Sequence, residues 1–253
     1  MISYELRDGV AWITMADGDR GNPVNPEWGS QMFAAVRRAR ADLASVVVLR
    51  ATGRFFSVGG DVGSFGTAGD IGEHIDDLAE ALHRIVSDLT RLDAVVVAAV
   101  QGFAAGAGFP LAAAADIVIA AESARFTLGY TKLGFSIDGG SSLLVHTLGL
   151  HRMLRLALLN DVLTAPEALA AGLVARVVPD ESLDASVAEL VEALASGPAA
   201  AQVSVKRLLR DAVDPNPEQA MRRETLAIRR NAALPDGVEG VAAFLEKRAP
   251  KFS

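Results

Sequence analysis

Apolar and polar positions follow one another in patterns that predict alternating strands and helices over the first 149 residues. Ile2-Ser3-Tyr4-Glu5-Leu6 alternates as a strand does, Asp8-Gly9 indicates a tight hairpin turn, and Val10–Met15 predicts the returning strand. Apolar residues at 32, 33, 36 and 39 have helical spacing, so a helix is expected from Pro26 to about residue 43. The chain therefore begins with a hairpin followed by a helix.

Two short apolar runs, 45–51 and 94–100, are rich in valine and predict buried strands. A glycine-containing loop follows each run, at 52–61 and 102–108. Helices are expected at about 71–91 and 107–115, and another strand at 116–120. After Gly149 the pattern is helical, apart from a strand at 173–178. Parallel strands of this kind bring their following loops to one edge of a sheet, where α/β proteins usually bind ligands.

Composition narrows the class of protein. The chain has 253 residues, of which 51% are hydrophobic, enough for one large core. The longest apolar-rich stretch, 94–121, is broken by Gln101, glycines, Pro110 and Asp116, so it predicts core rather than a membrane span. A net charge of -7 argues against nucleic acid or an anionic membrane as partner. The absence of cysteine excludes disulfides and a thiolate nucleophile and is consistent with a cytoplasmic location.

Two loop motifs carry a family resemblance: Arg54-Phe55-Phe56-Ser57-Val58-Gly59-Gly60-Asp61 and Gln101-Gly102-Phe103-Ala104-Ala105-Gly106-Ala107-Gly108. They resemble the Phe-x-Ala-Gly-x-Asp and Asn-Gly-x-x-x-Gly-Gly-Gly patterns of the enoyl-CoA hydratase/isomerase (crotonase) family. Further matches are 22–25, 132–134, 138–140 and the tail from Glu239 to Arg248, so the resemblance spans nearly the whole chain. It implies an α/β fold, a crotonase-like ββα spiral core over 1–197, with a C-terminal helical trimerisation region over 198–253.

The chemistry expected of the two loops is oxyanion stabilisation. Reactions beside a thioester place negative charge on its oxygen, and two backbone N–H groups aimed at that oxygen stabilise it. By resemblance, these groups belong to Val58 and Ala107. One alternative is that the glycines only permit close packing. A dinucleotide fingerprint fails because Leu111 occupies its third small position, and no serine lies in a Gly-x-Ser-x-Gly motif.

The two glutamates of a family hydratase are replaced here by Pro110 and Tyr130, which cannot act as carboxylate bases. Asp138 remains in this region. Related isomerases place a proton-shuttling aspartate at this position, and related dehalogenases place a nucleophilic one there. The alternative for Asp138 is an N-cap of the following helix. His83 matches a histidine of those dehalogenases, but we expect it to be an ordinary packed side chain.

The resemblance also implies substrate contacts and partners. The residues expected to contact the substrate are Pro23, Val24, Phe56, Gly59, Gly60, Asp61, Val62, Gly106, Tyr130 and Leu133; those expected to bind its CoA portion are Arg54, Phe244 and Lys247. Part of the pocket wall is expected at 63–70. The ligand is an acyl-CoA thioester, and coenzyme A enters only as part of the substrate. No metal or permanently bound cofactor is expected. By resemblance the assembly is a homotrimer or a hexamer made of two trimers.

The leading functional prediction is double-bond isomerisation of an enoyl-CoA, with an oxyanion-stabilised enolate and Asp138 as proton shuttle. Three alternatives remain: hydration by an unusual route, displacement at a halide or thioester with Asp138 as nucleophile, and a catalytically silent acyl-CoA-binding protein. Turnover distinguishes the enzymes from the silent binder.

Overall fold

A computed structural model of the protein describes residues 1–65 and 71–252. Its main sheet has the strand order β1-β2-β3-β4-β6-β9, in which only the β1–β2 pair is antiparallel. Its strands are β1 (Ile2–Arg7), β2 (Val10–Met15), β3 (Val46–Ala51), β4 (Val95–Val100), β6 (Ile117–Ala121) and β9 (Arg176–Val178). The expected hairpin is confirmed: Asp8 and Gly9 both have the positive φ angles that a tight two-residue turn requires.

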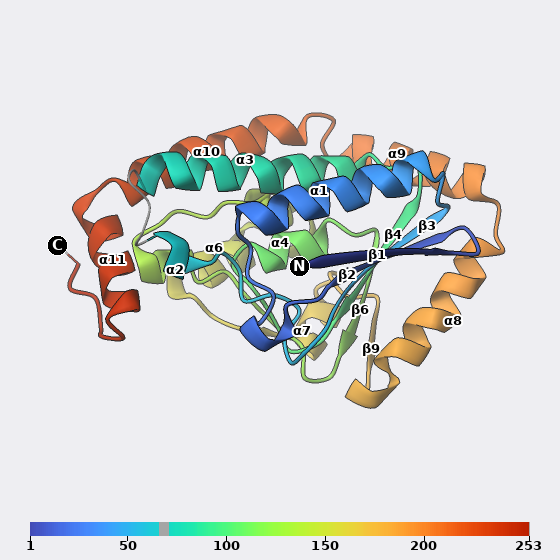
Figure 1. Ribbon diagram of the computed structural model, residues 1–253, viewed down its shortest axis with the longest axis horizontal. Helices are drawn as coiled ribbons and strands as arrows, with labels where there is room; N and C mark the ends of the chain where they lie inside the picture. Colours follow the sequence, from blue (N-terminus) through green and yellow to red (C-terminus); the bar gives the residue numbers. More distant parts are fainter. Residues whose placement is uncertain (66–70, 253) are drawn as a thin grey trace.

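Helices cover both faces of this sheet (Figure 1). In chain order they are α1 (Pro26–Ala41), α2 (Val62–Phe65), α3 (Ile71–Thr90), α4 (Gly108–Ala113), α5 (Val145–Leu148), α6 (Leu150–Leu159), α7 (Ala165–Ala170), α8 (Leu183–Ala195), α9 (Ala199–Val213), α10 (Pro217–Ala232) and α11 (Pro235–Leu245). Helices α1, α3 and α10 lie side by side over one face, whereas α8 packs on the other against β3, β4 and β6.

The central strands are buried on both faces, which explains their unbroken apolar runs. In β4, Val96, Ala98 and Val100 belong to the larger core beneath α1 and α3, and the alternate residues Val97 and Ala99 belong to the core beneath α8. A parallel sheet covered on both faces has this continuous apolar pattern. The sequence therefore identified these strands through their composition.

A second, small sheet was not predicted. It has the order β5-β7-β8 and consists of β5 (Phe103–Ala105), β7 (Arg125–Thr127) and β8 (Leu163–Thr164). Strands of two or three residues are too short to show an alternating pattern, and the segment containing β5 was expected to be a turn. The strand expected at 173–178 is confined to 176–178, because the N–H groups of Leu173 and Val174 bond back to the carbonyl of Ala168 at the end of α7.

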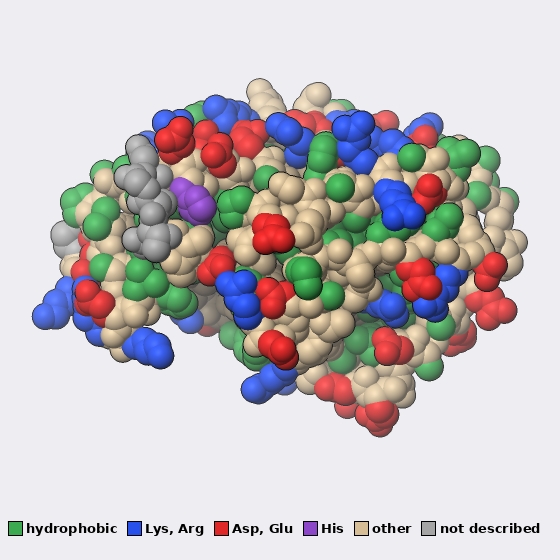
Figure 2. Space-filling model, in the orientation of Figure 1, with side chains coloured by type: hydrophobic (Ala, Val, Ile, Leu, Met, Phe, Trp, Pro, Cys, Tyr) green, Lys and Arg blue, Asp and Glu red, His purple; other side chains and the backbone are tan. Residues whose placement is uncertain are grey.

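The part of the wall expected at 63–70 is only partly described: 62–65 form α2, and 66–70 lie outside the described residues. None of the helices within 1–65 and 71–252 is long and apolar enough to span a membrane. Acidic and basic side chains are interspersed over the face shown in Figure 2.

Candidate active site

The two glycine loops predicted to carry the chemistry lie in direct contact after β3 and β4. Ser57 donates its N–H to the carbonyl of Phe103 at 3.0 Å, and Ala105 donates its N–H to the carbonyl of Ser57 at 2.9 Å. Gly59 has a φ of +89°, and a Cβ there would lie 2.8 Å from the carbonyl oxygen of Ala105. This close backbone approach explains glycine at position 59.

Asn22 anchors the first of these loops. Its side-chain amide donates to the backbone carbonyls of Thr52 at 3.0 Å and Phe55 at 2.9 Å. The backbone carbonyl of Asn22 accepts the Ser57 hydroxyl at 2.9 Å. Three residues later, the Asn25 side chain caps α1 by accepting the N–H of Trp28 at 2.9 Å. The motif at 22–25 therefore fixes the loop and begins the helix beside it.

The prediction that Val58 supplies an oxyanion donor is wrong. Its N–H donates to the carbonyl of Gly21 at 2.9 Å and is not available to a ligand. Asp61 likewise donates its N–H to the carbonyl of Val24, whereas Gly60 lies on the cavity wall and its N–H has no hydrogen-bond partner among the described residues. Ala107 also lies on the cavity wall, and its N–H likewise has no hydrogen-bond partner among the described residues. Among the described residues, Gly60 and Ala107 therefore each present an unbonded N–H from one of the two loops to the cavity, where the pair can bind an oxyanion.

A cavity of about 580 Å³ opens beside these two amides. The residues that were predicted for the site and do line this cavity are Pro23, Val24, Val58, Gly60, Asp61, Val62, Gly106, Ala107, Tyr130, Leu133, Asp138 and Phe244. The rest of the wall is largely apolar and includes Phe65, Ile75, Leu78, Leu82, Leu128, Phe135 and Ile228. Such a lining is suited to an acyl chain, with polar groups at only a few positions.

Four predicted contact residues do not reach this cavity. Phe56 is fully buried in the core, and Gly59 packs against the second loop. Arg54 and Lys247 are exposed and are not part of the cavity wall. The arginine instead lies over the ring of Phe55, with 5.0 Å between its guanidinium carbon and the ring centroid. Sequence proximity to the motifs did not indicate which way these side chains point.

Two cations that the sequence analysis did not single out lie on the wall. Arg20 donates to the Asp61 carboxylate at 2.7 Å, and Lys132 is exposed on the 3₁₀ turn Tyr130–Leu133. The Asp61 side chain is therefore paired with a cation. Lys132 has no ion-pair partner among the described residues.

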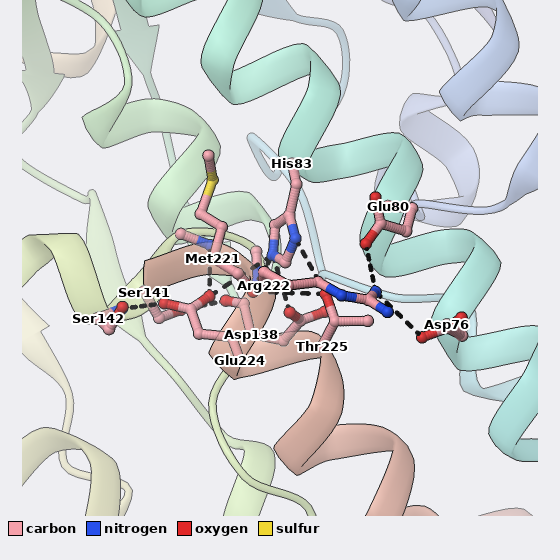
Figure 3. A network of polar contacts seen from close by, with 12 residues as sticks. Asp76, Glu80, His83, Asp138, Ser141, Ser142, Met221, Arg222, Glu224 and Thr225 are labelled. Atoms are coloured by element: carbon pink, nitrogen blue, oxygen red, sulfur yellow. Dashed lines mark hydrogen bonds and ion pairs between the residues drawn. The ribbon is translucent and has the colours of Figure 1, made fainter. Parts of the chain in front are cut away.

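Asp138 belongs to a buried polar cluster with His83 of α3 and Glu224 of α10 (Figure 3). The Asp138 Oδ1 atom lies 2.9 Å from His83 Nε2, and Glu224 Oε2 lies 3.6 Å from the same nitrogen. His83 Nδ1 lies 3.2 Å from the hydroxyl of Thr225. The expectation that His83 is an ordinary packed side chain is therefore wrong, because its ring faces the candidate catalytic carboxylate.

The alternative role of Asp138 as a helix cap is also overturned. The 3₁₀ turn that follows, Ser141–Leu144, has no side-chain cap from Asp138. Instead, the Glu224 carboxylate accepts the N–H of Gly140 at 2.7 Å and the N–H of Ser142 at 2.6 Å. Glu224 performs the capping, and the Asp138 side chain is left facing His83 and the cavity.

His83 has a partner in either protonation state. Its Nε2 accepts the N–H of Gly139 at 3.1 Å when the imidazole is neutral, and faces Asp138 when it carries a proton. Burial lowers the pKa of His83, but hydrogen bonding to and attraction by Asp138 and Glu224 outweigh it and raise this pKa to about 9. The imidazolium is therefore the form expected near neutral pH.

The same three side chains have metal-ligand chemistry, since one ligand atom from each lies within 4.8 Å of the others. Both Glu224 oxygens, however, accept backbone N–H groups. The donor set therefore fits a hydrogen-bonded proton network better than a metal centre.

Glu224 was missed by the sequence analysis, although a signal was present. Met221, Thr225 and Ile228 occur at helical spacing on the buried side of α10, and Glu224 lies among them. A carboxylate within an apolar stripe is rarely buried without partners. The pattern could have singled out this residue, but not its contacts.

Comparison with known proteins identifies the family. Residues 5–253 match the family model described as "Enoyl-CoA hydratase/isomerase". The chain belongs to the enoyl-CoA hydratase/isomerase family. It is 36% identical over its full length to a probable enoyl-CoA hydratase of Rhodobacter capsulatus, covering 97% of that protein. It is 34% identical over its full length to the 1,2-epoxyphenylacetyl-CoA isomerase of Escherichia coli, covering 98% of that protein.

The fold is that of the family as well. A crystal structure of an enoyl-CoA hydratase from Mycobacterium avium subsp. paratuberculosis superposes with a TM-score of 0.90 at 34% identity, covering all of this chain and 98% of that one. At the positions expected for the two hydratase glutamates, Pro110 is buried within α4, and Tyr130 donates its hydroxyl to the backbone carbonyl of Asp138 at 3.1 Å. Burial and the nearby carboxylates raise the pKa of Tyr130, so its phenol stays protonated.

Proposed function

We propose that this family member shifts the double bond of an enoyl-CoA thioester and that Asp138 shuttles the proton. One observation carries the proposal. Among the described residues, the cavity wall contains two carboxylates, and Asp61 is paired with Arg20 at 2.7 Å. Asp138 is the other wall carboxylate, and its neighbour is the titratable His83 rather than a permanently charged guanidinium. Asp138 shares the cavity with the free N–H groups of Gly60 and Ala107.

The reaction follows from these three groups. The thioester oxygen accepts the N–H groups of Gly60 and Ala107, Asp138 removes a proton from one carbon, and the charge moves onto the oxygen as an enolate. The protonated Asp138 then returns the proton to another carbon of the conjugated system, which moves the double bond. One well-placed backbone donor contributes on the order of 10²–10³ in rate. A single carboxylate is sufficient for this transfer, and neither Pro110 nor Tyr130 is needed as a base.

The similarity to an isomerase of acyl-CoA thioesters is consistent with this proposal, while the family also includes hydratases. The apolar cavity wall supports an acyl substrate, and exposed Lys132 is a candidate for a CoA phosphate because phosphates are bound by cations. A homotrimer or hexamer and a cytoplasmic location remain predictions.

A second candidate is displacement, because His83, which matches a histidine of the related dehalogenases in sequence, lies 2.9 Å from Asp138. In that reaction a carboxylate oxygen of Asp138 bonds to the substrate carbon that carries a halide, and the halide leaves. Water then hydrolyses the ester. Mass spectrometry of the protein after rapid quenching distinguishes the two reactions, because only displacement adds the acyl group to the peptide that contains Asp138.

The proposal is tested with a panel of 2- and 3-enoyl-CoA thioesters, followed by NMR in deuterated water. We expect conversion between the two positional isomers without addition of water. Formation of 3-hydroxyacyl-CoA as the main product would overturn the proposal in favour of hydration. Tight binding with no conversion of any substrate would favour a silent acyl-CoA-binding protein.

A further inference from the structure

Glu224 is a buried charged side chain that has no place in the reaction described so far. The residue is 5% exposed and does not belong to the cavity wall. A carboxylate is costly to bury unless its oxygens have strong partners. Each Glu224 oxygen accepts one backbone N–H, from Ser142 at 2.6 Å and from Gly140 at 2.7 Å.

These two N–H groups belong to the segment that immediately follows Asp138. Gly139 and Gly140 have φ angles of +72° and +88°, a region that favours glycine. Two consecutive glycines give the backbone after Asp138 great conformational freedom in the absence of outside contacts. Glu224 supplies such contacts from α10, a helix distant in sequence from the loop.

The other side of the same segment faces His83. Its Nε2 lies 3.1 Å from the N–H of Gly139 and 2.9 Å from Asp138 Oδ1, while its Nδ1 lies 3.2 Å from the hydroxyl of Thr225. Thr225 directly follows Glu224, so α10 contacts both the loop and the histidine that faces it. Figure 3 shows His83 descending from α3 onto the side chains of Asp138, Glu224 and Thr225.

We propose that Glu224 is the positioning residue of this site, fixing the loop after Asp138 and, through His83, the orientation of the Asp138 carboxylate at the cavity wall. The proposal rests on the proton-shuttle function argued above. The charged groups that face His83 are Asp138 from the loop and Glu224 from α10, and the phenol of Tyr130 donates to the backbone carbonyl of Asp138. Two carboxylates favour the imidazolium, so removal of one lowers the pKa of His83.

The test compares Glu224→Gln with Glu218→Gln. Glu218 also lies on α10 and contacts the region of α3, through Ser87 at 2.7 Å and Arg91 at 2.8 Å. Unlike Glu224, its side chain is about half exposed. We expect E224Q to lower kcat on the order of 10²-fold with KM little changed, since a small misplacement of a catalytic group has effects of this size. The pKa of His83, followed by NMR, should fall in E224Q and stay unchanged in E218Q.

Glu224→Asp supplies the conservative comparison. It keeps the charge but shortens the side chain, so the pKa of His83 should remain raised while kcat falls less than in E224Q. This variant decides the question if E224Q does not fold. Equal kcat, pH profile and His83 pKa in wild type, E224Q and E218Q would overturn the positioning role. If wild type moves no double bond, the proposed function fails, whereas the NMR titration still tests the coupling of Glu224 to His83.

Discussion

Gly59 determines how closely the two glycine loops approach each other. A Cβ at this position would lie 2.8 Å from the carbonyl oxygen of Ala105 and 3.3 Å from the Cα of Gly106. Both loops present a free amide to the cavity, so Gly59→Ala should separate the N–H groups of Gly60 and Ala107. We expect turnover to fall on the order of 10²–10³-fold, the effect of losing one oxyanion donor.

Gly172→Ala is the matched control for this substitution. Gly172 has a φ of +79°, similar to that of Gly59, but a Cβ there meets nothing within 4 Å. The left-handed backbone costs about 1–2 kcal/mol with alanine in either position. Turnover should therefore be kept in G172A, measured on the same substrate. Equal activity of G59A and wild type would show that the contact between the loops is not needed.

His83 gives the protein a pH-dependent stability. Its pKa is raised from 6.5 to about 9 in the folded protein, so the protonated histidine stabilises the fold fully below pH 6.5, and this stabilisation is lost as pH rises through 9. The difference corresponds to about 3 kcal/mol. Urea unfolding between pH 6.5 and 9.5 should show this loss in wild type and a much weaker loss in His83→Asn. Parallel curves for the two proteins would contradict the raised pKa.

For single residues, the sequence indicated which side chains could carry the chemistry better than it indicated which residues contact one another. Asp138 could be singled out because it is a carboxylate within a family motif. The donor role was placed on Val58 instead of Gly60, because which N–H groups remain free depends on the carbonyls of Gly21 and Val24 in the neighbouring loop. Glu224 could not be placed beside Asp138, since the two are brought together only by the packing of α10 on α3.

Among the elements, α9 is attached to the core by one buried cation. The Lys206 ammonium donates to the carbonyls of Leu89 and Ala94, each at 2.9 Å, and lies 2.9 Å from Asp116 Oδ2. Lys206→Met removes the buried ammonium from both carbonyls and from Asp116, which keeps Arg210 as a partner at 2.9 Å, and should lower the free energy of unfolding by about 3 kcal/mol. Urea denaturation measures the change.

Arg207→Met is the comparison within the same helix. Arg207 pairs with Asp93, and both side chains are more than half exposed, so its loss should cost less than about 1 kcal/mol. A similar loss of stability in the two variants would show that burial of Lys206 does not determine how α9 is held.

The elements differed in how well they could be predicted. Long ones such as α1 and α3, and valine-rich strands such as β3 and β4, were expected within a few residues of their observed bounds. The strands β5, β7 and β8 were not expected, because they are formed by pairing between distant segments rather than by local pattern. This small sheet matters to the site, since β5 leads directly into the loop that bears Ala107.

In the whole molecule, the exposed apolar side chains of α9 suggest that this surface is covered by other copies of the chain. Val205, Leu208, Leu209 and Val213 are 55–71% exposed. We expect the protein to sediment as a trimer or hexamer and the double variant Leu208→Glu with Leu209→Glu to sediment as smaller species. Leu43→Glu, at an 87% exposed leucine outside this helix, is the control that should keep the assembly. A monomeric wild type would contradict the expectation.

Asp138→Asn tests whether Asp138 moves the proton. The amide keeps the size of the side chain but cannot act as the base. Double-bond migration and exchange of the substrate proton should both be measured for wild type and D138N, together with the affinity for the acyl-CoA. We expect migration and exchange to be lost in D138N while acyl-CoA binding is retained. Full turnover by D138N on a substrate that wild type converts would contradict it.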